Sequence, residues 1–160
     1  MWADYNPGVQ HPTNIPRHNP PSIRSVETEA DFQAAMVVRF AVFVDEQGVP
    51  RELEHDAADA TAAHVIAERD GAVIGTGRLV EIDGAAVLGR IAVTPAHRRQ
   101  GIASLLIAAL EGEARQRGYT EATLHAQTYV QALYVANGYA VFGSPFVEAG
   151  IDHVSMIKSL

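Results

Sequence analysis

Apolar residues recur along the chain with two periods, and the longer period predicts two main helices. One run at helical spacing follows Thr28, which forms a capping box with Asp31, and ends at residues 48–50. A second run begins after Gly101 and ends at Arg117 and Gly118. The apolar positions are Phe32, Met36, Phe40 and Phe43 in the first helix, and Ile102, Leu105, Leu106, Ala109 and Leu110 in the second.

Shorter apolar runs bounded by turn residues predict the strands of a sheet. Asp70-Gly71 and Asp83-Gly84 are favoured hairpin turns, so three consecutive strands are expected to form an antiparallel meander. The strand after the second main helix is expected to lie parallel to residues 87–93, and a short helix over 130–137 ends at Gly138. The polar, acidic residues 51–60 are expected to form a loop. The expected strands cover 22–26, 64–69, 72–81, 86–93, 121–126, 140–142 and 153–158.

These elements predict an α/β (α+β) fold with a mixed, mostly antiparallel sheet of six to seven strands. The chain has 160 residues, 48% of them apolar, which is enough for one domain with a sizeable core, expected over residues 22–160. Residues 1–21 hold five of the eight prolines and are expected to form a flexible N-terminal arm. The alternative is a strap anchored by Trp2, Tyr5 and Ile15.

Charge and cysteine content narrow the function classes. A net charge of −7 disfavours nucleic acid as a partner and mildly favours a cationic substrate such as an amine. The absence of cysteine excludes disulfides and thiolate metal sites and is compatible with a reducing compartment, so a cytoplasmic location is expected. No apolar run reaches the length of a membrane span, and no histidine pair has metal-ligand spacing, so neither a membrane nor a metal partner is expected.

A basic turn between a strand and a helix is the main candidate for chemistry. Arg98, Arg99 and Gly101 precede the second main helix, whose first N–H groups and macrodipole favour an anion such as a phosphate. The alternative is a helix N-terminus that carries two solvated arginines. No P-loop pattern is present, and the lone G-x-G at Gly75 and Gly77 indicates a strand irregularity rather than a nucleotide loop.

Two spaced motifs resemble those of the GNAT N-acetyltransferase superfamily. Residues 98–103 (Arg-Arg-Gln-Gly-Ile-Ala) match its acetyl-CoA pyrophosphate motif, R/Q-x-x-G-x-G/A. Residues 134–139, from Tyr134 to Tyr139, resemble its second signature, Y-x-x-x-G-F/Y. Residues 42–50, 124–127 and 153–156 resemble the ElaA/YjcF-like branch, so the resemblance extends over nearly all of residues 22–160.

The resemblance implies a sheet splayed between two parallel strands, flanked by about four helices, with acetyl-CoA in the gap. Main-chain groups of the splayed strand near Arg90–Val93 would serve the pantetheine arm and the oxyanion. The chain departs from the family at Gln127 and Val130, where asparagine and alanine are usual. The cofactor-binding residues expected are Ile91, Ala92, Val93, Arg98, Arg99, Gln100, Gly101, Ile102, Ala103, Ser104, Gln127 and Tyr134.

The expected reaction is direct transfer of the acetyl group of acetyl-CoA to an amine of a small molecule, peptide or protein. Tyr134 is the expected general acid for the leaving thiolate; the alternative is a core tyrosine hydrogen-bonded to the backbone. Glu46 and His125 are equal candidates for the base, and a solvated or structural role remains the alternative for each. The expected substrate-binding residues are Glu46, Gln47, Arg78 and His153, although Arg78 could instead pair with an acid of residues 45–56.

Two other function classes remain open at this point. One is a non-catalytic sensor domain that binds acyl-CoA through the same loop. The other is a partner-binding domain that binds no CoA. The sequence carries no code for the acceptor amine, and dimers are common among the proteins it resembles, so a homodimer is a further expectation.

Overall fold

The computed structural model describes residues 19–160, in which two Asp-Gly turns set the first half of the sheet. Asp70 and Gly71 adopt left-handed φ angles of 52° and 80°, and Asp83 and Gly84 adopt 51° and 79°. Such pairs match the twist of the strands that they connect. The expected antiparallel meander follows directly from these two turns.

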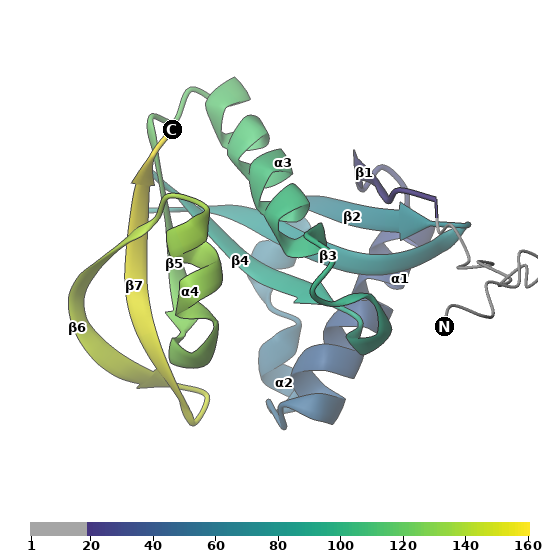
Figure 1. The fold of residues 1–160 in the computed structure, drawn as a ribbon, viewed down its shortest axis with the longest axis horizontal. Helices are drawn as coiled ribbons and strands as arrows, with labels where there is room; N and C mark the ends of the chain where they lie inside the picture. The colour runs from purple at the N-terminus through teal and green to yellow at the C-terminus, as the bar shows by residue number, and fades with distance from the viewer. Residues whose placement is uncertain (1–18) are drawn as a thin grey trace, which may run out of the picture.

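The described residues form one seven-stranded sheet in the order β1-β2-β3-β4-β5-β7-β6. The helix α3 crosses one face of the sheet, α1 and α2 lie behind the other, and α4 packs against β5 (Figure 1). The predicted mixed, mostly antiparallel sheet is confirmed, while the arm predicted for residues 1–21 lies almost wholly outside the described residues. The strands are β1 Ser22–Ser25, β2 Ala63–Arg69, β3 Ala72–Ile82, β4 Ala85–Val93, β5 Glu121–Gln127, β6 Ala140–Glu148 and β7 Ile151–Ser159. The helices are α1 Glu29–Arg39, α2 Arg51–Glu54, α3 Ile102–Gln116 and α4 Gln131–Ala136, with the π-helix η1 Phe40–Glu46 and the 3₁₀-helices η2 Ala57–Ala60, η3 Pro95–His97 and η4 Thr128–Val130.

Two local expectations were wrong. Residues 51–60 form α2 and η2 instead of a loop. Asp56 and Asp59 form a capping box that stabilises η2. The Asp56 carboxylate accepts from the amide of Ala58 at 3.0 Å, and the Asp59 carboxylate accepts from the amide of Asp56 at 3.1 Å. Strand β6 covers nine residues and not three. The turn-forming residues 143–145 do not end it, because the chain continues through a register shift between Phe142 and Phe146.

Glycines in β3 let α3 approach the sheet closely. A Cβ atom at Gly77 would lie 2.9 Å from Leu110 Cδ1, and one at Gly75 would lie 3.1 Å from Leu106 Cδ1. The pairing with β4 also shifts register between Thr76 and Arg78. The strand irregularity predicted for this G-x-G is therefore confirmed.

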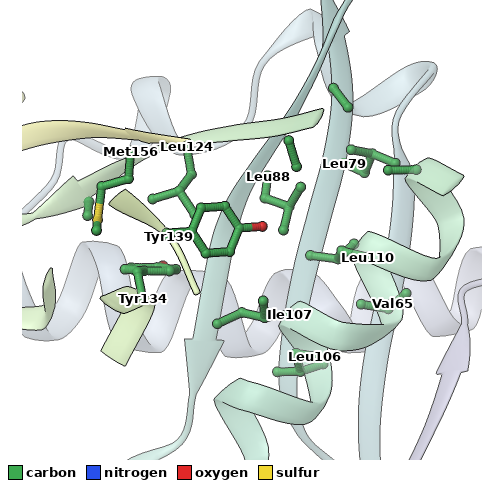
Figure 2. Packing of buried hydrophobic residues seen from close by; sticks show 14 of the residues in the cluster. Val65, Leu79, Leu88, Leu106, Ile107, Leu110, Leu124, Tyr134, Tyr139 and Met156 are labelled. Atoms are coloured by element: carbon green, nitrogen blue, oxygen red, sulfur yellow. The ribbon is translucent and has the colours of Figure 1, made fainter. Parts of the chain in front are cut away.

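The core lies between α3 and the sheet and includes both tyrosines of the second motif. Tyr139 lies among Leu88, Leu124 and Ile107, with Tyr134 close by (Figure 2). The rings of Tyr134 and Tyr139 meet edge to face with centroids 6.1 Å apart. Both rings belong to one buried cluster with Leu124 of β5 and Met156 of β7, so they pack α4 against this half of the core.

A buried ion network fastens α2 and η2 to the rest of the fold. Arg39 is 1% exposed and bonds Glu54 Oε1 at 2.6 Å and Asp59 Oδ1 at 2.7 Å. Arg78 bonds Asp56 Oδ1 at 2.7 Å and Asp59 Oδ1 at 2.8 Å. Burial raises the pKa of Glu54, because it outweighs the hydrogen bond from Arg39 that would lower it. In Asp59 the hydrogen bonds from Arg39 and Arg78 outweigh burial, so the pKa of Asp59 is lowered.

We expect Arg39→Ala to lower the free energy of unfolding by about 3–5 kcal/mol, because it leaves buried carboxylates without a main partner. Urea denaturation followed by circular dichroism measures the change. Arg24→Ala is the matched control, since Arg24 forms an exposed pair with Asp31 and Glu68. Similar losses in the two variants would contradict this role of the network.

Candidate active site

The parting of β4 and β5 creates the candidate site. These parallel strands pair only from Ala86 to Leu88, opposite Ala122 to Leu124, and then diverge (Figure 1). A cavity of about 500 Å³ opens beyond this point. Its walls come from η1, residues 91–93 of β4, the loop into α3 with the first turn of this helix, Gln127 at the end of β5, and residues 129–134 of η4 and α4. The splay that the resemblance implied is therefore present.

Arg90 holds the distorted part of β4. Its φ angle of 52° is left-handed, which is unusual for a residue with a side chain, and it coincides with the register shift against β3. The guanidinium donates to the carbonyl of Leu53 at 3.1 Å and to that of Glu54 at 3.3 Å. Arg90 thus ties the bend of the strand to α2, and Ile91 to Val93 follow it as cavity wall.

The N-terminus of α3 forms a second wall of the cavity. Gly101 caps the helix with φ 78° and no side chain, and Arg99 before it has φ 59°. The first helical hydrogen bond runs from the amide of Leu105 to the carbonyl of Gly101 at 3.2 Å, so the amides of residues 102–104 have no partner within the helix. Residues 101–104 all line the cavity, where these amides and the macrodipole favour an anion.

Arg98 and Glu46 join two walls of the cavity through an ion pair. The guanidinium Nε donates to the carbonyl of Val93 at 2.9 Å, while Nη1 and Nη2 donate to the Glu46 carboxylate at 2.7 and 2.6 Å. The hydrogen bonds from Arg98 lower the pKa of Glu46, and the same bonds raise the pKa of Arg98. Both side chains remain about 40% exposed, so the pair contributes little to stability.

Three side chains close a hydrogen-bond ring beside this pair. Tyr129 donates to Gln127 Oε1 at 2.6 Å, Gln127 donates to Gln47 Oε1 at 2.8 Å, and Gln47 donates to the Tyr129 hydroxyl at 3.0 Å. The ring connects the end of η1 to η4 across the cavity. Gln47 and Gln127 were expected at the site from the sequence, whereas Tyr129 was not, although its position two residues after Gln127 was the available signal.

Tyr134 lines the cavity from α4 and is 8% exposed. Burial raises the pKa of Tyr134 to about 12, so the phenol keeps its proton throughout the neutral range. Asn137 of the same motif donates to Ser104 Oγ at 3.0 Å. This bond ties the end of α4 to the first turn of α3, so the structure brings the two sequence motifs together at one cavity.

Four residues proposed from the sequence lie outside the cavity. Arg78 belongs to the buried ion network, as the alternative interpretation held. His125 is exposed and contacts Glu148 at 3.2 Å, and His153 contacts the carbonyl of Ile151 at 2.7 Å. The amide oxygen of Gln100 accepts from Arg69 at 2.7 Å. The remaining proposed residues, Glu46, Gln47, Ile91, Ala92, Val93, Arg98, Arg99, Gly101, Ile102, Ala103, Ser104, Gln127 and Tyr134, line the cavity.

Comparison with known proteins identifies the family. The model of the acetyltransferase (GNAT) domain matches residues 25–160, and the chain belongs to this family. The chain is 35% identical over 133 residues to the N-acetyltransferase YjcF of Bacillus subtilis (strain 168), over 82% of this chain and 95% of that protein. This finding agrees with the expected ElaA/YjcF-like branch, and the chain is an enzyme of the acyltransferase class.

Solved structures share the fold. An acyl-CoA N-acyltransferase from Pseudomonas aeruginosa is 28% identical with a TM-score of 0.77, over 87% of this chain and 99% of that chain. ElaA of Escherichia coli has the same TM-score and coverage at 22% identity, which supports the fold alone. Within residues 19–160, no cluster of side chains could hold a metal ion, and no helix is long and apolar enough to cross a membrane.

Proposed function

We propose that this enzyme transfers the acetyl group of acetyl-CoA directly to an amine of a small molecule or peptide, with Tyr134 as general acid. One observation carries the proposal: the buried phenol and the open N-terminus of α3 border the same cavity. An anchor for phosphate and a proton donor thus line one and the same cavity.

The residues present fit acetyl-CoA. The amides of residues 102–104 suit a diphosphate, and Gly101 leaves space for it because a Cβ there would meet no atom within 4 Å. The free edge of β4 offers the main-chain groups of Ile91 and the N–H of Val93 to a pantetheine arm and to an oxyanion, while the carbonyl of Val93 is taken by Arg98. When bound, acetyl-CoA supplies the activated thioester.

Tyr134 holds the proton for the leaving sulfur. A phenol with a pKa near 12 stays neutral at physiological pH and donates a hydrogen bond as charge develops on a thiolate. The burial that raises this pKa also raises the pKa of a thiol that leaves beside it.

Glu46 is better suited to bind the ammonium group of an acceptor than to act as a general base. Its pKa is lowered by Arg98, so the carboxylate is ionised at neutral pH but binds a proton weakly. Val42 and Phe43 line the cavity near it, and such apolar walls lower the pKa of a bound amine. This desolvation opposes the ion pair with Glu46, which favours the ammonium, and it offsets part of the roughly 4.6 kcal/mol that a lysine-like amine needs to lose its proton to solvent at pH 7. We therefore propose Glu46 and Gln47 for binding the acceptor.

Tyr134→Phe should lower kcat by about 100-fold and leave CoA affinity unchanged, because the variant loses only the proton donor. A thiol reagent measures CoA release from acetyl-CoA with a panel of amines, and calorimetry measures CoA binding. Tyr139→Phe, a neighbouring buried tyrosine outside the cavity, is the matched control. Wild-type turnover in Tyr134→Phe would contradict the acid role. Tight CoA binding without turnover in the wild-type protein and in both variants would favour the alternative of a non-catalytic sensor domain.

Gly101→Glu should weaken CoA binding on the order of 100-fold, the loss expected for two charge-assisted hydrogen bonds. The new carboxylate would stand at the helix N-terminus and repel a diphosphate. Gly101→Ala is the control, since it imposes the same strain at φ 78° without the charge. Equal calorimetric affinities for the two variants would show that no phosphate binds at this turn.

A further inference from the structure

Glu46 is the only acid among the described residues that line the cavity, and it is already bound to Arg98 in the loop before α3. Glu46 lines the cavity from η1, and Arg98 lines it from the loop before α3. Both terminal nitrogens of Arg98 point to the Glu46 carboxylate, at 2.7 and 2.6 Å. As it stands, the side chain that would bind a cationic acceptor is neutralised by a side chain that would bind the cofactor.

The geometry makes this pair easy to exchange. Arg98 is anchored separately through Nε to the carbonyl of Val93 at 2.9 Å, so its stem keeps its place if the terminal nitrogens change partner. Both side chains are about 40% exposed, unlike Arg39 and Glu54, whose pair is 1–2% exposed. A diphosphate presents more charge than a carboxylate and offers the same two-pronged acceptor geometry to a guanidinium.

We propose that Arg98 is shared between Glu46 and the cofactor diphosphate, so that cofactor binding releases the Glu46 carboxylate for the acceptor ammonium. This inference rests on the proposed function, because it assumes a diphosphate at the N-terminus of α3. It couples the part of the cavity that would bind the cofactor to the part that would bind the acceptor. Arg98 holds Glu46 until a cofactor diphosphate takes the place of the carboxylate, and Glu46 is then free for the acceptor.

A double-mutant cycle on CoA affinity tests the coupling. The variants are Glu46→Gln, Arg98→Gln and the double substitution, with CoA as the probe in calorimetry at fixed ionic strength. Glu46→Gln should tighten CoA binding roughly two- to fivefold, the range for removing one exposed competing ion pair. Arg98→Gln should weaken binding, and the second substitution should then give no gain. Glu113→Gln is the matched control, since Glu113 forms an exposed pair with Arg117 on α3, outside the cavity.

Each outcome decides the proposal. A gain from Glu46→Gln that disappears in the Arg98→Gln background supports sharing of Arg98. The same gain in both backgrounds means that Glu46 merely repels the diphosphate, and no gain in either means that the pair stays intact; both results overturn the proposal while the proposed function stands. If wild-type protein binds no CoA, the proposed function fails and the inference fails with it.

Discussion

Strands β4 and β5 share only three residue pairs, and the site depends on the place where this pairing stops. A parallel pair that continued would use its main-chain groups within the sheet and leave no gap. Arg90 holds the bend in β4 by donating to the carbonyls of Leu53 and Glu54, and those residues are fixed in turn by the buried network around Arg39. The buried charges thus stabilise an opening in the sheet. That opening supplies the edge of backbone on which the proposed thioester chemistry depends.

Charges are used in two ways in this molecule. The arginines of the buried network are bound to carboxylates that solvent barely reaches, so they fix geometry and are costly to disturb. The pair between Arg98 and Glu46 is half-exposed and is anchored on one side only, so it can change partner at little cost. The uncharged ring of Gln47, Gln127 and Tyr129 lies beside this pair and orients polar groups without adding charge. The buried ion network that fixes the fold is therefore separate from the exposed pair of Arg98 and Glu46 that lines the cavity.

Much of the fold could be predicted from the sequence because its signals are local. Asp-Gly turns, the capping box at Thr28 and the glycine before α3 each act within a few residues. The helix α2 was missed because Glu54 is held by Arg39, which is remote in sequence, although the capping box of Asp56 and Asp59 was a local signal for η2. His125 and Gln127 share one face of β5 by alternation, yet only Gln127 reaches the cavity, because the opening lies beyond the carboxyl end of the strand. The partners of these charged side chains and the point where β4 and β5 diverge depend on the assembled sheet, so local sequence signals do not give them.

In the proposed function, main-chain amides at the start of α3 and along the open edge of β4 bind the cofactor. Hydrogen exchange of wild-type protein with and without saturating CoA, resolved to individual amides, tests it most directly. The amides of residues 102–104 have no helical partner and should exchange rapidly in the free protein. CoA should slow their exchange together with that of residues 91–93. Unchanged exchange at both segments under saturating CoA would show that these amides do not bind the cofactor.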